Sequence, residues 1–130
     1  MSTTGGNLHA TSLRPFVPAK DYQQARAFYA TIGFRELWTS PDLSLMTIDS
    51  CTFFLQNFFT QHFADNYMLS LMVDDLDEWW ANLQSLHLAD RFPGARMKEP
   101  ADYPWGMREI HLIDPSGVCW HLATPIRAKS

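Results

Sequence analysis

Polar and apolar residues alternate through the last third of the chain, in the segments 109–112 and 118–123. Alternation with a period of two predicts β-strands that turn one face to a core. Between these segments, Asp114-Pro115-Ser116-Gly117 supplies the proline and glycine that a tight turn requires. The pattern therefore predicts a hairpin in which His121 projects from the middle of the last strand toward one face of a sheet.

The first half of the chain has the order strand, helix and three strands. Asp21 is placed to cap a helix whose apolar residues recur with a 3.6-residue period between 22 and 32, and Gly33 is placed to end it. Alternation and turn residues predict strands at 13–17, 34–39, 43–48 and 52–58. Leu13, Pro15 and Val17 are expected on the helix-facing side of the first strand.

The second half repeats this order. A strand is predicted at 68–73, and Asp75 with Glu78 forms a capping box at the start of a second helix. A less regular strand at 91–98 and a loop at 99–103 precede the hairpin. The pattern at 20–22 aligns with that at 74–76, and the pattern at 45–49 aligns with that at 110–114. Two alignments in the same order indicate an internal duplication.

Two copied units predict an α+β fold. Two βαβββ modules, at about 12–59 and 66–124, would form a curved, partly open eight-stranded sheet with both helices on the outside. They make up a single domain at 12–124, with a disordered N-terminal tail at 1–11 and a C-terminal tail at 125–130. The sheet face away from the helices mixes polar groups with aromatics and methionines, which is typical of a small-molecule cavity.

Composition narrows the possible functions. A chain of 130 residues with 46% hydrophobic residues can bury the core of one domain. It has no apolar run long enough for a membrane helix, and its net charge of −4, without a lysine or arginine cluster, argues against nucleic acid. Cys51 and Cys119 have neither metal-type nor disulfide-type spacing, which favours a reducing, cytoplasmic location.

Three segments together resemble a known family. Residues 17–34, residues 72–75, and Trp105-Gly-Met-Arg followed by Asp114-Pro-Ser-Gly are similar to the glyoxalase/bleomycin-resistance/dioxygenase domain, the vicinal oxygen chelate superfamily. The resemblance extends from about Leu13 to Thr124. It implies the fold described above but no single activity, because the superfamily includes lyases, dioxygenases, thiol transferases and non-catalytic drug-binding proteins.

The resemblance also implies where a metal would be held. The four ligand positions of metal-using members fall on Arg14, Gln56, Met68 and His121. Arginine has no free lone pair and methionine is a soft ligand, so only His121 is a good ligand and Gln56 a weak one. The family's metal is therefore interpreted as lost, and neither catalytic residues nor a cofactor are predicted.

What remains resembles the bleomycin-resistance branch, whose members are cytoplasmic dimers that sequester a drug in an aromatic crevice between subunits. We therefore predict a metal-free protein that binds an aromatic drug or metabolite, acts by sequestration and forms a homodimer. Exposed aromatics in the linker 58–63 suggest a dimer contact. The predicted ligand-binding residues are Arg14, Phe16, Trp38, Phe54, Gln56, Phe58, Met68, Ser70, Tyr103, Trp105 and His121.

Two alternatives stay open. The first is a metal-dependent lyase or dioxygenase in which His121 and Gln56 act with a third ligand, His111 or Glu109. The second is a domain whose cavity is filled by its own aromatics and which serves only assembly. Arg14 is expected either to pair with an acidic residue such as Glu109 or to bind an anionic group of a ligand. Cys119 is interpreted as inert packing rather than as a nucleophile activated by His121.

Overall fold

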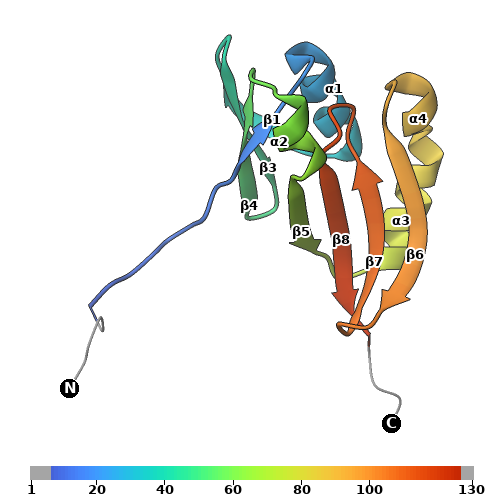
Figure 1. Ribbon diagram of the computed structural model, residues 1–130. Coiled ribbons are helices and arrows are strands. Elements are labelled where there is room, and N and C mark those ends of the chain that lie inside the picture. Colours follow the sequence, from blue (N-terminus) through green and yellow to red (C-terminus); the bar gives the residue numbers. More distant parts are fainter. Residues whose placement is uncertain (1–6, 127–130) are drawn as a thin grey trace.

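The computed structural model describes residues 7–126 (Figure 1). Residues 1–6 and 127–130, which belong to the predicted tails, lie outside the described residues. Residues 7–11 are exposed and outside any helix or strand. Within residues 7–126, none of the helices combines the length and the apolar character required to cross a lipid bilayer. The predicted boundaries of the domain and its modules stay predictions.

The first module contains β1 (Phe16–Pro18), α1 (Tyr22–Ile32), β2 (Arg35–Thr39), β3 (Leu43–Ile48) and β4 (Cys51–Gln56). Its sheet has the order β1-β4-β3-β2, with β1 parallel to β4. Helix α1 begins where the Asp21 side chain accepts a hydrogen bond from the Gln24 amide, 3.0 Å away. It ends at Gly33, whose φ of 132° favours glycine.

The second module contains β5 (Met68–Met72), α3 (Leu76–Leu86), β6 (Arg96–Tyr103), β7 (Met107–Ile113) and β8 (Cys119–Pro125). Its sheet has the matching order β5-β8-β7-β6, with β5 parallel to β8. Asp75 caps α3 by accepting a hydrogen bond from the Glu78 amide. The predicted α+β fold of two βαβββ modules is confirmed, with its eight strands divided between two four-stranded sheets.

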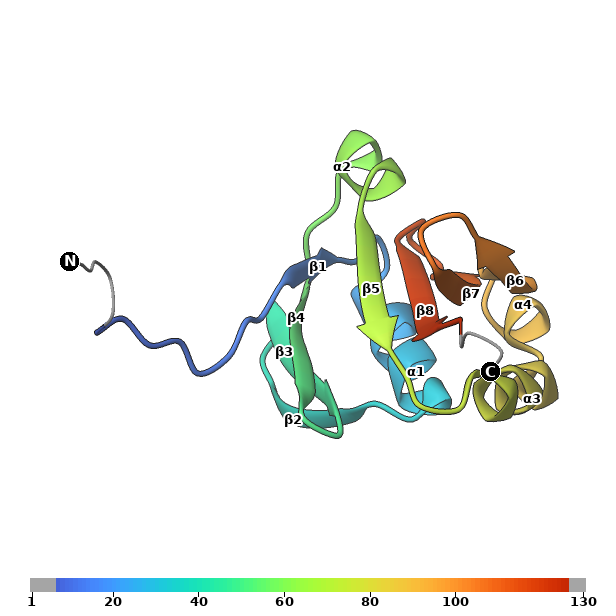
Figure 2. The same cartoon turned by 90° about the horizontal axis from the view of Figure 1, so that it is seen from below.

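Helix α1 packs against β2 and β4 of the first sheet, α3 packs against β6, β7 and β8 of the second, and the two helices contact each other (Figures 1 and 2). The core is continuous across both modules. Tyr29 of α1 is buried, and its hydroxyl donates to the Asp114 carboxylate and accepts from Trp120 Nε1. Helix α1 of the first module thereby packs into the core of the second module, and these contacts hold the two modules together.

The structure corrects three expectations. Strand β1 begins only at Phe16, and Leu13 is 90% exposed rather than turned to the helix. Residues 99–103 belong to β6 rather than to a loop. The register of β6 shifts between Lys98 and Ala101, around Pro100, and this irregularity hides the alternation.

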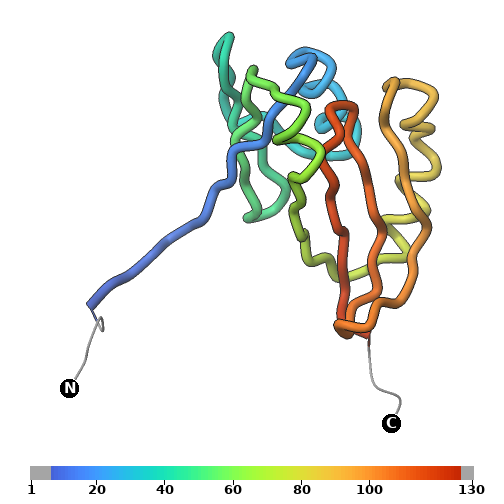
Figure 3. Tube along the Cα trace, viewed as in Figure 1, coloured from blue at the N-terminus to red at the C-terminus, as the bar shows by residue number. Residues whose placement is uncertain are grey.

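Two short helices, α2 (Gln61–Asp65) in the linker and α4 (Leu88–Arg91) after α3, were not predicted. The path of the whole trace is clearest in Figure 3.

Candidate functional site

Three polar side chains meet on the face of the second sheet that turns away from α3. In the register of β7 with β8, His111 stands opposite His121 and Ile110 opposite Leu122. Ile110 and Leu122 are buried in the core. Because successive strand residues point to opposite faces, Glu109, His111 and His121 all project to the other side.

One carboxylate oxygen joins these side chains. His111 Nε2 and His121 Nδ1 each lie 3.0 Å from Oε1 of Glu109. The second oxygen, Oε2, accepts a hydrogen bond of 2.9 Å from Trp105 Nε1. Glu109 is only 4% exposed, so this carboxylate is held almost entirely by protein groups. We refer to Glu109, His111 and His121 as the polar triad.

The Glu109 carboxylate carries the negative charge of the triad. Burial acts to raise the pKa of the Glu109 carboxyl, but hydrogen bonds from Trp105, His121 and His111 outweigh it and lower the pKa to about 2. Glu109 is therefore ionised at neutral pH. Within residues 7–126, no lysine or arginine lies at ion-pair distance from Glu109, and its ion-pair partners are the two histidines.

Aromatic rings continue this face. Tyr103 stacks on Trp105 with ring centres 4.9 Å apart, and on His111 with ring centres 5.0 Å apart. Trp105 is 61% exposed and offers a free surface for stacking. Among the described residues, the Tyr103 hydroxyl and His121 Nε2 are buried polar atoms without a hydrogen-bond partner. Such groups are suited to a molecule that supplies the missing partner.

A second group of aromatics lies on the first sheet. Phe16 stacks on Phe54 with ring centres 4.7 Å apart, and Trp38 lies 6.1 Å from Phe54. These rings share the face away from α1, because Val17 and Leu55, their neighbours in sequence, are fully buried. Phe16 and Trp38 are nearly half exposed. We refer to Phe16, Trp38 and Phe54 as the aromatic face.

The remaining predicted residues divide between the two sheets. Arg14 is exposed and precedes β1. Gln56 is the last residue of β4 and stands opposite Pro18. Phe58 lies just after β4 and is 51% exposed. On the second sheet, Ser70 stands opposite His121, and Met68 at the start of β5 is 65% exposed. Within residues 7–126, no hydrogen bond, ion pair or aromatic contact joins the two groups.

Within residues 7–126, the predicted pairing of Arg14 with Glu109 is absent, and Glu109 and His111 were not among the predicted ligand-binding residues. In the described part of the chain, Glu109 pairs with histidines rather than with Arg14. The sequence suggested His111 or Glu109 as a third metal ligand, and Glu109 also as a possible partner of Arg14. The signal was present in the sequence, since both alternate in phase on one strand and a hairpin brings that strand against the strand of His121.

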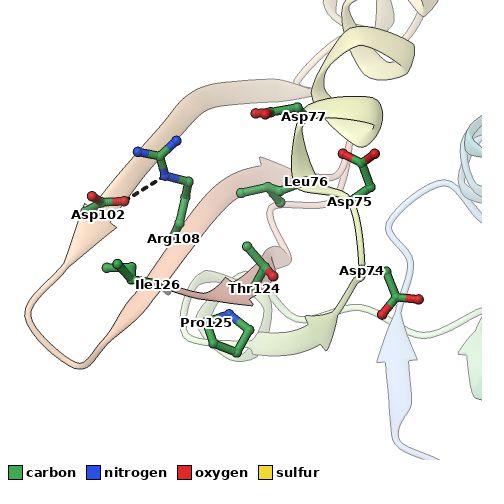
Figure 4. A pocket seen from close by; sticks show the side chains of 9 residues that line it. All are labelled: Asp74, Asp75, Leu76, Asp77, Asp102, Arg108, Thr124, Pro125 and Ile126. Carbon is green, nitrogen blue, oxygen red and sulfur yellow. Dashed lines mark hydrogen bonds and ion pairs between the residues drawn. The ribbon is translucent and has the colours of Figure 1, made fainter. Parts of the chain in front are cut away.

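A pocket of about 460 Å³ opens on the opposite side of the second sheet (Figure 4). Arg108 lines it and, as the neighbour of Glu109 in β7, points away from the triad. The Arg108 guanidinium forms an ion pair with the Asp102 carboxylate, with an Nε–Oδ1 distance of 2.7 Å. No predicted ligand-binding residue lines this pocket. We take the triad and the aromatic face as the candidate site because of their side-chain contacts.

Comparison with protein families gives a match over most of the chain. The family model described as the glyoxalase/bleomycin resistance protein/dioxygenase superfamily matches residues 8–122. The chain belongs to this superfamily. A comparison with curated protein sequences gives no match.

Solved structures of this superfamily share the fold. A bleomycin-binding protein in complex with bleomycin is 21% identical, covers 88% of this chain and 98% of its own, and has a TM-score of 0.77. A bleomycin-binding protein from Streptomyces verticillus, in complex with copper(II)-bleomycin, is 24% identical, covers 88% and 96%, and has a TM-score of 0.76. A lactoylglutathione lyase from Agrobacterium tumefaciens is 16% identical, covers 88% and 94%, and has a TM-score of 0.65.

The four positions that the resemblance assigns to a metal do not suit one in this chain. Arg14 and Gln56 lie in the first module, whereas Met68 and His121 lie in the second. An arginine has no lone pair to offer, and a thioether suits soft ions rather than those that carboxylates and imidazoles hold. We therefore derive no chemical step through a metal at these four positions.

Proposed function

We propose that this protein binds a planar aromatic small molecule, a drug or a metabolite, and acts by sequestering it. The observation that carries the proposal is the pair of exposed aromatic surfaces, the aromatic face on one sheet and the Tyr103–Trp105 stack beside the polar triad on the other. Flat rings bind well to such surfaces by offset stacking. Arg14, Gln56 and His121 would orient the polar parts of the ligand.

The solved bleomycin-binding proteins that share this fold support the proposal. Two of them are described in complex with bleomycin or copper(II)-bleomycin, so this arrangement of strands is compatible with holding a large drug. The fold also occurs in a lyase. The choice between binding and catalysis therefore rests on the side chains, and those of this chain favour stacking.

A homodimer is part of the proposal. Several large apolar side chains on or beside the two sheets are 45–65% exposed, among them Phe16, Trp38, Met68, Met72 and, in the turn between β6 and β7, Trp105. A symmetric dimer would place the aromatic face of one copy against the triad face of the other and cover both. Each of two identical sites would then take residues from both sheets. Cys51 and Cys119 are free thiols, which suits the cytoplasm.

The proposal is tested by fluorescence titration. Bleomycin and a panel of planar aromatic compounds are added to the protein, and tryptophan emission is followed together with mass by light scattering. We expect quenching by at least one compound, and a dimer at micromolar concentration. Trp105→Phe and Trp38→Phe should each remove part of the quenching and weaken binding.

Trp79→Phe is the matched control, because Trp79 packs against the core from α3 and lies outside the candidate site. It should lower total emission but leave the affinity unchanged. Unchanged emission across the whole panel would refute the proposal, as would quenching that only Trp79→Phe removes. A monomer that still binds would refute the shared site alone.

A further inference from the structure

We propose that Glu109, His111 and His121 bind one divalent transition-metal ion, such as zinc, at a position distinct from the superfamily's metal site. That site would draw on Arg14, Gln56, Met68 and His121, on or beside four different strands. The triad takes all its ligands from one antiparallel pair, β7 and β8. Only His121 is common to the two sets.

The donor atoms are already close to the spacing that a metal needs. Glu109, His111 and His121 can each offer one donor atom such that the three atoms lie within 4.8 Å of one another, and His111 Nε2 and His121 Nδ1 are each 3.0 Å from Glu109 Oε1. Tetrahedral zinc with bonds of about 2.0–2.1 Å holds its ligand atoms about 3.3 Å apart. The two nitrogen–oxygen separations are within a few tenths of an ångström of that value. Side-chain rotation would have to bring the two imidazole nitrogens to the same separation when the ion binds.

The triad also offers a cation an ionised oxygen. Glu109 is 4% exposed, its partners are Trp105 and the two histidines, and no lysine or arginine within residues 7–126 pairs with it, so a metal ion would meet a carboxylate that no such side chain neutralises. Without a metal, both rings direct a nitrogen at the same carboxylate oxygen. With a metal, those two nitrogens become ligands, and Nδ1 of His111 and Nε2 of His121 carry the ring protons.

The surroundings of the triad hold it in place. Trp105 Nε1 hydrogen-bonds Oε2 of Glu109 and leaves Oε1 for the metal, while the stack of Tyr103 on His111 fixes the plane of that imidazole. Such outer partners orient metal ligands and tune their strength. Two imidazoles and a carboxylate leave a zinc coordination position open. Both histidine side chains are 21% exposed, so solvent reaches part of the triad, and water or a donor atom of a small molecule would fill that position.

The experiment uses zinc and cobalt(II) as the only probes. The full chain, purified without a histidine tag and dialysed against EDTA, is titrated with zinc by calorimetry, and bound metal is counted by elemental analysis. We expect one ion per chain. Cobalt(II) should give the visible absorption of a low-coordinate site with nitrogen ligands, and zinc should displace it.

Variants locate the ion. Glu109→Gln and His121→Gln should each weaken zinc binding by more than the 10- to 100-fold typical of losing an outer partner, and Trp105→Phe should weaken it within that range. His62→Ala is the matched control, because His62 is exposed on α2 and has no part in the triad. It should leave affinity and stoichiometry unchanged. Circular dichroism identifies any variant that has not folded.

Two results would overturn the inference. One is a folded wild-type chain that binds no stoichiometric metal. The other is zinc binding that persists in folded Glu109→Gln and His121→Gln. Either leaves the proposed function standing, because the aromatic ligand panel is tested on the EDTA-dialysed protein. Conversely, a metal site with no aromatic ligand would refute sequestration and leave this inference intact.

Discussion

The hydroxyl of Tyr29 makes two buried hydrogen bonds between the two modules, and removing it tests how the modules are held together. Tyr29 lies on α1, whereas its two partners, Asp114 and Trp120, belong to the β7–β8 hairpin of the second module. All three residues are buried, with exposed fractions of 1%, 0% and 5%. Tyr29→Phe deletes one oxygen and leaves the aromatic packing unchanged.

The expected cost follows from what the substitution leaves behind. The indole N–H of Trp120 loses its acceptor, and Oδ2 of Asp114 loses its donor, while Oδ1 keeps the amides of Ser116 and Val118. A buried polar group without a partner costs about 1–3 kcal/mol, so the two together lower the free energy of unfolding by about 4 kcal/mol. That is a large share of the roughly 5–15 kcal/mol typical of a domain.

Equilibrium unfolding in urea at neutral pH, followed by circular dichroism, measures this loss. Tyr67→Phe is the control, because its ring is only half-buried and its hydroxyl has no hydrogen bond within residues 7–126; it should change stability by at most about 0.5 kcal/mol. A loss below about 1 kcal/mol for Tyr29→Phe would refute the view that this hydroxyl joins the modules.

Two further predictions concern acid stability and helix capping. In the metal-free protein, folding lowers the pKa of Glu109 from 4.5 to about 2. Its ionised form therefore stabilises the fold above pH 4.5, and this contribution, at most about 3 kcal/mol, disappears as the pH falls toward 2. Urea unfolding should show a smaller acid loss for Glu109→Gln, and parallel profiles would contradict this. Asp75→Ala removes the cap of α3 and should cost about 1 kcal/mol in thermal unfolding. Asp77→Ala, which removes no cap, should cost less, and equal losses would count against the capping role.

Local signals in the sequence determined most of the elements. Asp21 and Asp75 begin the two long helices and Gly33 ends the first, because a cap acts on amides or carbonyls within one turn. The β7–β8 hairpin was predicted because its strands alternate around a proline–glycine turn, and β3 because turn residues bound a short, mostly apolar run. Strand β6 was predicted only in part, because Pro100 and the shift of register break its alternation. The duplication and the fold class follow from the same local patterns, because the order of one strand, one helix and three strands occurs in both halves of the chain.

Only the tertiary structure decided which side chains meet. The register of β7 with β8 sets His111 opposite His121 and brings both to Glu109, because one residue of slippage would turn these side chains into the core. The division into two sheets likewise separates the aromatic face from the triad, although the sequence predicted one lining. Alternation determines which residues share a face of a strand. Strand pairing and packing, which act between residues far apart in the chain, determine which faces meet.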